Sequence, residues 1–406
     1  MISVAEAIRI VKEQTSPLPV ERVALANAIG RVLAEAIVAD SDLPPFDRAQ
    51  MDGYAVRATD TSEVPARLRI VGEAAAGRGW PGVIQRGEAV RIMTGAPVPA
   101  GADAVQRLEV TRELDSGILV EITQTVALKQ SITKQASEIK AGATVFDTGE
   151  RITAQMIAVL ASFGYAMIKV RKRPRVAVIA TGSELVAVEN QPGPDNIRDS
   201  NSYSLAAYAE LTGALAERLP LAGDDPKLLQ EMIAAVAEQA DLLVLSGGVS
   251  VGAYDFTKAA LRALDAEIIF ERVALRPGKP TVFARLPQPG STLVLGLPGN
   301  PVSAAVTFNL FARTALLTMQ GASDATMIEE RAILSDGIKG SAGRISYLPG
   351  RLSTDEEGRL IAEPLRRWGG SSDFVAFAQT TALIIVPEDV KMLDAGAKVN
   401  VVRLPG

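Results

Sequence analysis

Ser246-Gly247-Gly248-Val249-Ser250-Val251-Gly252 follows the strand-like run Asp241 to Leu245 and precedes a helical pattern that opens at Asp255. A strand, a glycine turn and a helix start in this order are typical of phosphate binding, because glycine permits positive φ and lets backbone N–H groups approach a ligand. The helix adds roughly half a positive charge at its N-terminus. The stretch therefore predicts an anion site in an α/β fold, and a plain tight turn is the alternative.

A second glycine turn lies 50 residues further along the chain. Gly296-Leu297-Pro298-Gly299-Asn300-Pro301 follows the apolar run Leu293 to Leu295 and precedes a helical pattern from Val302 to Thr318. Asn300 is a favourable N-cap and Pro301 a favourable first helical residue. Two such turns in one α/β unit predict a single anionic ligand held from two sides.

Composition narrows the range of partners. The chain has 406 residues, which predicts two to four domains. The 42 Lys and Arg against 47 Asp and Glu leave a net charge of −5, so no basic surface for nucleic acid or polybasic membrane signal is expected. Met1 to Ser16 fits an amphipathic helix and not a signal peptide, and no apolar run reaches the length of about 18 residues that spans a bilayer. We expect a cytoplasmic protein with small-molecule substrates.

The chain contains no cysteine and no histidine. Their absence excludes disulfides, thiolate nucleophiles, Ser-His-Asp catalysis and the usual zinc ligands. Any metal must be a hard ion bound by oxygen. Mg²⁺ suits such a site because one or two carboxylates, substrate phosphates and water complete its shell.

The pattern of apolar residues predicts a multidomain fold of α/β and β type. Helical patterns at Val4 to Gln14, Leu25 to Leu33 and Thr153 to Phe163 predict an elongated helical connector domain, and short alternating runs between Gly and Pro clusters predict β domains. The expected division is connector domain 1–40 with 140–173, small β domain 41–139, doubly wound α/β domain 174–322 and C-terminal β-barrel 323–406.

The α/β domain is the clearest part of the prediction. Val176 to Ala180 is continuously apolar, as a strand buried on both faces of a sheet should be. Strands and helices then alternate, which predicts a mostly parallel sheet with its ligand crevice at the carboxyl ends of the strands. The expected helices are Ser202 to Leu211, Pro226 to Gln239, Phe256 to Leu264 and Val302 to Thr318, and the further strands are Leu242 to Leu245, Ile268 to Leu275, Val282 to Leu286 and Leu293 to Leu295.

Several carboxylates should lie near that crevice. Glu184 follows the first strand, Asp224 precedes Pro226, and Asp255 follows the glycine turn. Each could be a helix cap or a solvated loop charge. As a group they indicate a cation, because an anionic ligand among carboxylates is repelled by about 4 kcal/mol per close pair at a dielectric of 20. Mg²⁺, with Arg276 and Lys279, would supply that positive charge.

Two rigid loops of the β region are also unusual. Pro44 to Val56 contains Asp52, and Arg91 to Pro99 places Thr94 after an apolar strand. Their apolar residues could simply anchor the loops in the core. A site completed by another subunit is compatible with both loops.

These segments, taken in order, resemble the molybdopterin molybdenumtransferase family, the MoeA and gephyrin E-domain proteins. The resemblance covers nearly the whole chain and rests on an ordered set of motifs. They are PPFDRAQMDGYAV at Pro44 to Val56, RIMTGAPVPAGADAV at Arg91 to Val105, TGSEL at Thr181 to Leu185, DSN at Asp199 to Asn201, SGGVSVGAYDF at Ser246 to Phe256, RPGKP at Arg276 to Pro280 and GLPGNPVSA at Gly296 to Ala304.

The resemblance implies a homodimer of four-domain chains that inserts molybdenum from molybdate into adenylylated molybdopterin, with Mg²⁺-dependent hydrolysis of the adenylate and release of AMP. Its implied partners are an upstream adenylyltransferase and molybdoenzyme acceptors. The implied molybdopterin contacts are Gly247, Gly248, Ser250, Pro298, Gly299 and Asn300, with Ser371 near molybdate; the implied catalytic residues are Asp52, Thr94, Glu184, Asp255, Arg276 and Lys279; and the implied metal ligands are Asp52, Glu184, Asp224 and Asp255.

One segment departs from the family pattern. Thr133 to Glu138 stands where many members carry an arginine-rich run that ends in Gly-Glu-Asp. Such arginines could contact an anionic substrate, so their loss favours an alternative function as a molybdopterin or cofactor carrier without catalysis. A scaffold role is a third alternative, and no exposed aromatic stripe in the C-terminal region supports it.

Overall fold

The computed structural model describes residues 1–248, 256–287, 291–365 and 369–405. The chain divides into two compact units. One comprises Met1–Glu35, Thr148–Ile157 and Ala166–Gly406, and the other comprises Ala36–Asp147 and Ala158–Tyr165. The four-domain boundaries expected from the sequence stay a prediction.

The first unit contains the predicted α/β sheet. Its six strands run in the order β16-β13-β17-β21-β20-β18. The first four are parallel in register, so that Ala180 of β13 lies opposite Ser246 of β17, which lies opposite Leu297 of β21. The carboxyl ends of three central strands therefore meet at one edge. The strands are β13 (Arg175–Ala180), β16 (Leu215–Arg218), β17 (Leu242–Ser246), β18 (Glu267–Phe270), β20 (Val282–Arg285) and β21 (Leu293–Leu297).

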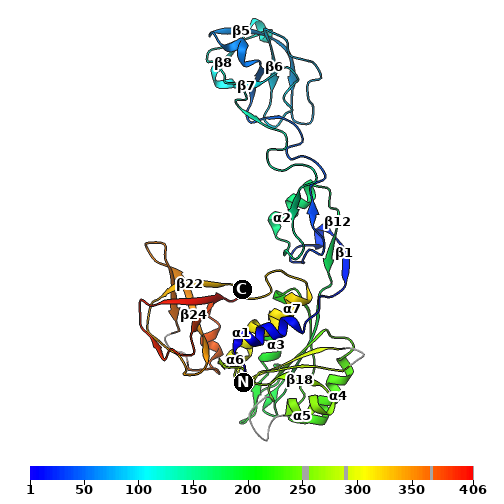
Figure 1. Cartoon of the computed structure of the whole chain (residues 1–406), viewed down its shortest axis with the longest axis vertical. Coiled ribbons are helices and arrows are strands. Elements are labelled where there is room, and N and C mark those ends of the chain that lie inside the picture. The colour runs from blue at the N-terminus through cyan, green and yellow to red at the C-terminus, as the bar shows by residue number, and fades with distance from the viewer. Residues whose placement is uncertain (249–255, 288–290, 366–368, 406) are drawn as a thin grey trace. The chain divides into compact units, whose positions relative to one another are not determined.

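Helices cover both faces of this sheet. Val176 and Val178 pack toward one face, and Ala177 and Ile179 toward the other, so β13 is buried on both sides. Figure 1 shows α1, α3, α6 and α7 grouped on one side, with α4 and α5 on the opposite side. These helices are α1 (Val4–Glu13), α3 (Asn201–Leu211), α4 (Pro226–Val236), α5 (Phe256–Ala263), α6 (Pro301–Thr307) and α7 (Arg313–Met319).

Helices α6 and α7 are joined by a π-helical turn, η5 (Phe308–Ala312). Within the described residues this continuous stretch, Pro301–Met319, is long and apolar enough to cross a membrane by length and composition alone. Because 89% of its apolar window is buried inside the protein, it has the character of a core helix.

Helix α1 belongs to the same core. Val4, Ala7 and Val11 are its buried residues, and they join the cluster that contains Phe308 and Phe311. Ser3 caps the helix by accepting a hydrogen bond from the Glu6 N–H. The apolar spacing of the first residues therefore reflects packing on the α/β sheet domain.

The structure corrects two expectations. Leu25 to Leu33 does not form a helix: only the 3₁₀ turn η1 (Leu25–Asn27) forms after β1 (Val20–Ala24), which pairs with β12 (Met167–Arg171). The sheet is mostly parallel, as expected, with β20 antiparallel to both of its neighbours, β21 and β18. The expected strand Ile268 to Leu275 is broken, and its end, β19 (Leu275–Arg276), pairs with a C-terminal strand.

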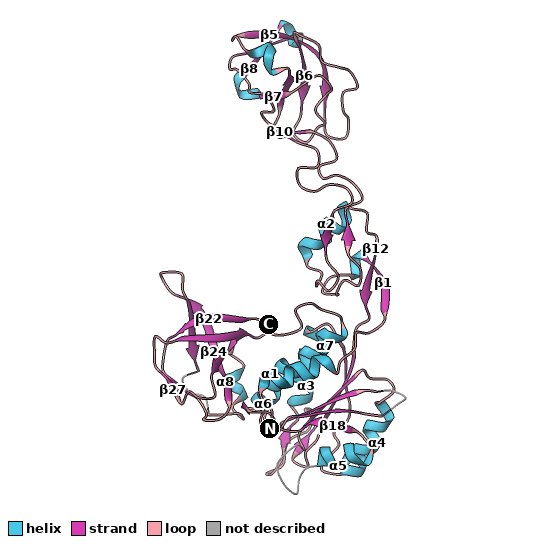
Figure 2. Cartoon of the chain, viewed as in Figure 1, coloured by secondary structure: helices cyan, strands magenta, loops and turns pink. Residues whose placement is uncertain are grey.

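The C-terminal region forms the predicted barrel. Strands β24, β25, β22, β28 and β26 pair in turn, and β26 pairs back with β24 to close the ring. Figure 2 shows these strands in magenta with the short helix α8 beside them. The elements are β22 (Glu329–Leu334), β23 (Ile338–Lys339), β24 (Ile345–Thr354), β25 (Leu360–Pro364), α8 (Phe374–Phe377), β26 (Ala382–Val386), β27 (Met392–Leu393) and β28 (Lys398–Arg403).

The second unit is the predicted small β domain. Its main sheet has the strand order β7-β4-β6-β5-β9-β8, and Tyr54 and Val90 are buried on opposite faces. Helix α2 (Ala154–Ser162) contributes residues to both units. The strands are β2 (Ile37–Val38), β3 (Arg48–Ala49), β4 (Gly53–Val56), β5 (Ala66–Ala74), β6 (Glu88–Ile92), β7 (Ala104–Arg107), β8 (Thr111–Leu114), β9 (Leu119–Ile122), β10 (Ile132–Thr133) and β11 (Thr144–Phe146).

Candidate functional site

The two glycine turns lie side by side at the carboxyl edge of the α/β sheet. The Gly247 N–H donates a hydrogen bond of 3.1 Å to the Leu297 carbonyl. A Cβ atom on Gly299 would lie 3.6 Å from the Gly247 Cα atom. Since β17 and β21 are in register, their following turns leave the sheet at the same level. The predicted convergence of the turns is therefore confirmed.

Both glycines of the first turn are required by its shape. Gly247 and Gly248 have φ values of 98° and 62°, which side chains other than glycine rarely adopt. A Cβ atom on Gly247 would overlap the Thr181 carbonyl oxygen, and one on Gly248 would lie 2.8 Å from the Thr257 Oγ1 atom. The backbone of the turn is consequently packed against β13 and α5.

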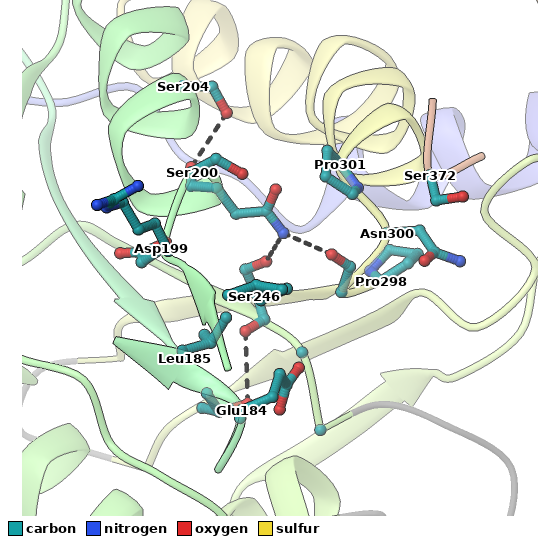
Figure 3. A pocket seen from close by; sticks show the side chains of 18 of the residues that line it. Glu184, Leu185, Asp199, Ser200, Ser204, Ser246, Pro298, Asn300, Pro301 and Ser372 are labelled. Carbon is teal, nitrogen blue, oxygen red and sulfur yellow. Dashed lines mark hydrogen bonds between the residues drawn. The ribbon is translucent and has the colours of Figure 1, made fainter. Parts of the chain in front are cut away.

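A cavity of about 1280 Å³ opens between these turns. Figure 3 shows Glu184, Ser246, Pro298 and Asn300 around a common hollow, with Ser372 beside Asn300. Its lining includes seven residues predicted from the sequence: Glu184, Asp224, Gly247, Gly248, Pro298, Gly299 and Asn300. One cavity thus contains both turns and two of the acidic side chains.

The two acidic residues of the cavity come from neighbouring loops. Asp224 Oδ2 accepts hydrogen bonds from the Ser183 N–H at 3.1 Å and from the Ser183 hydroxyl at 2.7 Å. This ties the loop that carries Glu184 to the loop before α4. Asp225, which precedes Pro226, caps α4 by accepting from the N–H groups of Lys227 and Leu228. Of the two adjacent aspartates, Asp224 is the one on the cavity wall.

Across the described part of the chain, no group of three or more acidic side chains is arranged to hold a metal. Asp255, a predicted metal ligand, and Ser250, a predicted molybdopterin contact, lie outside the described residues. Glu184 and Asp224 together still provide the one or two carboxylates that Mg²⁺ uses beside a phosphate ligand. Their oxygen donors fit a hard cation.

The cavity also contains a residue that was not predicted as a site residue. Asn201, the first residue of α3, donates through Nδ2 to the Ser246 hydroxyl at 2.8 Å and to the Gly299 carbonyl at 2.7 Å. It therefore joins the ends of β17 and the second glycine turn. The DSN motif marked Asn201 as part of the family resemblance, but only the fold shows which residues it contacts.

Asp199 of the same motif is a helix cap. Its carboxylate accepts hydrogen bonds from the Ser202 N–H and the Ser202 hydroxyl, and the residue is 5% exposed. The cap orients the first turn of α3, which in turn places Asn201.

The C-terminal domain reaches the rim of the cavity. Ser371 accepts a hydrogen bond of 3.1 Å from Asn300 Nδ2, and its carbonyl accepts from the Val302 N–H at the start of α6. Ser372 and Phe374 line the cavity itself. The predicted residue Ser371 thus lies against the second glycine turn and is held there by its side chain and backbone.

The structure does not place the two predicted basic residues on the cavity wall. The Arg276 guanidinium donates to the Lys339 and Gly340 carbonyls, so it joins β19 to the C-terminal domain. Lys279 is exposed, and no residue in the described ranges forms an ion pair with it. Pro280, the next residue, does line the cavity.

Asp52 and Thr94 meet in the β unit. β4 and β6 pair with Gly53 opposite Ile92, so the two predicted residues lie at neighbouring strand ends. Asp52 Oδ1 accepts hydrogen bonds from the Thr94 N–H at 2.7 Å and the Thr94 hydroxyl at 2.8 Å. These bonds, the one from the backbone above all, lower the pKa of the Asp52 carboxyl below its usual value.

The altered segment Thr133 to Glu138 is folded into the same unit. The Gln135 N–H donates to Asp47 Oδ1 at 2.7 Å, and Glu138 forms an ion pair of 3.1 Å with Arg48. The residues that replace the arginine-rich run are therefore bound to their own domain.

Three domain-family models match the chain. They are the MoeA N-terminal region (domain I and II) at residues 2–164, the probable molybdopterin binding domain at residues 177–318 and the MoeA C-terminal region (domain IV) at residues 331–404. Their order along the chain is that of the motifs.

Relatives match over the full length. A molybdopterin molybdenumtransferase of Nostoc sp. is 34% identical over 98% of this chain and 91% of its own, and molybdopterin molybdenumtransferase 2 of Mycobacterium tuberculosis is 36% identical over 99% of each. The crystal structure of a molybdopterin biosynthesis moeA protein from Pyrococcus horikoshii OT3 covers 100% of both chains with a TM-score of 0.84 and 28% identity. The chain belongs to the molybdopterin molybdenumtransferase family.

Proposed function

We propose that this protein inserts molybdenum from molybdate into adenylylated molybdopterin, with Mg²⁺-dependent hydrolysis of the adenylate and release of AMP. The observation that carries the proposal is the meeting of the Gly247 and Gly299 turns around one cavity. Because backbone N–H groups at such turns favour negative charge, the cavity suits a phosphorylated ligand. The proposed setting is the cytoplasm.

Different residues of the cavity would bind different parts of the substrates. The two glycine turns, the second of which includes Asn300, would bind the molybdopterin phosphate. Ser371, which accepts a hydrogen bond from Asn300, would lie near the molybdate. The dithiolene sulfurs belong to the substrate, so the absence of cysteine from the chain fits this chemistry. Phosphoanhydride hydrolysis depends mainly on positioning and charge neutralisation, which such a site supplies without a covalent nucleophile.

Glu184 and Asp224 are the described residues that would hold Mg²⁺, with Asp255 as a further proposed ligand. When bound, Mg²⁺ neutralises charge on the phosphoryl oxygens. The Ser183 bonds to Asp224 Oδ2 fix the orientation of that carboxylate toward the cavity. Lys279, exposed next to Pro280, would add a positive charge near the entrance.

We further propose a homodimer in which Asp52 and Thr94 of one chain complete the site of the other. An upstream adenylyltransferase would supply the substrate, and molybdoenzymes would accept the product. The two hydrogen bonds between Asp52 and Thr94 support a shared role for the pair, since they fix the carboxylate just before the start of β4.

The test is a direct assay of the full-length protein with adenylylated molybdopterin, Mg²⁺ and molybdate, in which AMP release is followed. We expect E184Q to raise the Mg²⁺ concentration that gives half the maximal rate by about tenfold or more. The matched control is E231Q. Glu231 is an exposed residue of α4 that does not line the cavity. If the parent protein binds molybdopterin but releases no AMP, the carrier function replaces the transferase.

A further inference from the structure

Asn201 is a buried amide between the two glycine turns. The residue is 9% exposed, lines the cavity and begins α3. Its Nδ2 atom donates to Ser246 at the end of β17 and to the Gly299 carbonyl of the second turn. A single NH₂ group therefore uses both of its hydrogens to bridge two segments that are 53 residues apart in the chain.

The orientation of this amide follows from its partners. The Gly299 carbonyl can only accept a hydrogen bond, so the nitrogen and not the oxygen must face it. The Oδ1 atom therefore points away from Ser246 and Gly299, and it is buried without a hydrogen-bond partner. An unpaired buried acceptor costs stability.

An unpaired amide oxygen does not by itself mark a site residue, because the Oδ1 atom of Asn309, in the core turn η5, is also buried without a partner and lies away from the cavity wall. What distinguishes Asn201 is the pair of segments that its Nδ2 atom joins. Gln320 provides the comparison within this chain. Its Nε2 atom likewise donates two hydrogen bonds, in this case to the backbone carbonyls of Thr212 and Leu316, but Gln320 does not line the cavity. Asn201 differs in that the segments it joins are the two ligand turns.

We propose that Asn201 is a positioning residue that holds the two glycine turns at the spacing required to bind molybdopterin. This inference rests on the proposed function, since molybdopterin is the ligand proposed there. The bridge acts through the N–H donors: one hydrogen fixes the Ser246 hydroxyl at the start of the first turn, and the other fixes the Gly299 carbonyl in the second. Without it, the turns lose their only described side-chain link through α3.

The test compares N201D, N201A and Q320E in the full-length protein, with molybdopterin as the probe in equilibrium binding and thermal unfolding as the second measurement. N201D has the same shape but, when ionised, no donor for Gly299. We expect both Asn201 variants to bind molybdopterin about tenfold or more weakly than the parent at neutral pH. Q320E should lower the unfolding temperature and leave the molybdopterin affinity unchanged.

Lowering the pH separates positioning from general damage. Protonation of the introduced carboxyl restores an O–H donor to Gly299, and burial favours that protonated form. The affinity of N201D relative to the parent at the same pH should therefore recover as the pH falls, while that of N201A stays low. Taking the ratio to the parent at each pH cancels effects that the two proteins share, including those of the charged residues that line the same cavity, which are Asp199, Glu184, Asp224 and Arg198.

Two results would overturn the inference. The first is N201A and N201D binding as tightly as the parent. The second is a loss in N201D that does not change with pH relative to N201A. If N201D does not fold, the test is the affinity of N201A for molybdopterin compared with that of Q320E. Equal losses of affinity in these two variants would mean that Asn201 has only a structural role. A parent protein that does not bind molybdopterin would overturn the proposed function itself, and the inference with it.

Discussion

Gly247 is the residue of the proposed ligand site whose backbone conformation is most restricted. Its φ of 98° and the nearby Thr181 carbonyl leave no space for a side chain. Gly396 has a similar φ of 83° but nothing within 4 Å of its Cβ position, so it is a matched control for strain without the steric clash.

We expect G247A to destabilise the protein more than G396A. Each substitution should cost about 1 to 3 kcal/mol for the left-handed conformation, and G247A adds the overlap with Thr181. Thermal unfolding measures the stability of each variant. The affinity for molybdopterin shows whether the turn can still bind the ligand. Equal unfolding temperatures for the two variants would show that the turn is looser than the structure indicates.

Asp52 provides a residue-scale prediction about pH. The Thr94 donors lower the pKa of this carboxyl, so its ionised form stabilises the fold at pH values above the ordinary aspartate pKa of about 4. That contribution is lost as the pH falls through the lowered folded-state pKa.

T94V removes the hydroxyl donor and keeps the backbone N–H. The pKa of Asp52 should therefore rise toward its usual value, which carbon NMR of the carboxyl group measures during an acid titration. T111V is the control, because the Thr111 hydroxyl donates to the Leu108 carbonyl and not to the Asp52 carboxylate. An unchanged Asp52 pKa in T94V would contradict the described contact.

At the scale of elements, the docking of α1 ties the start of the chain to the α/β core. Val11 is fully buried, whereas Val20 on β1 is 43% exposed. V11A removes two buried methyl groups, and we expect it to lower the free energy of unfolding by about 2 kcal/mol. V20A should change it little. Chemical denaturation followed by circular dichroism measures the free energy of unfolding of both variants. Equal changes in V11A and V20A would contradict the packing of α1 in the core.

The helices and strands of the α/β domain are the elements that the sequence predicted best. The α3, α4, α6 and α7 helices and the strands beside them were predicted because their apolar spacing reflects burial on one or both faces. Leu25 to Leu33 has helix-like spacing, but the chain there pairs with neighbouring segments, as in the bridge between Leu33 and Val170. Tertiary pairing overrides local pattern at that point. The antiparallel direction of β20 depends on chain topology, which apolar periodicity does not encode.

At the scale of the whole molecule, the homodimer proposal predicts complementation between inactive chains. In an assay at a Mg²⁺ concentration well below the one that gives E184Q half its maximal rate, D52N and E184Q should each have little activity alone if Asp52 of one chain and Glu184 of the other form one site. Random mixing of the two variants gives mixed dimers with one intact site, so about a quarter of the parent AMP release should return. Mixed D52N and T94V chains are the control and should recover none. No recovery in the first mixture would contradict a site formed by Asp52 of one chain and Glu184 of the other.

The candidate site was predictable to the extent that its residues stand at strand ends. Gly247 and Gly299 follow strands that are in register, so their meeting follows from the parallel sheet. Asn201 was missed because its bonds connect distant segments, and nothing in a DSN triplet specifies those partners. Arg276 illustrates the converse, since its charge indicated a ligand contact while the fold directs it to the Lys339 and Gly340 carbonyls.

The most direct measurement is a crystal structure of the full-length protein with bound molybdopterin. We expect electron density for the ligand in the cavity of about 1280 Å³, with the phosphate between the Gly247 and Gly299 turns and within hydrogen-bonding distance of their N–H groups. Ligand bound at another surface, with this cavity left to solvent, would contradict it.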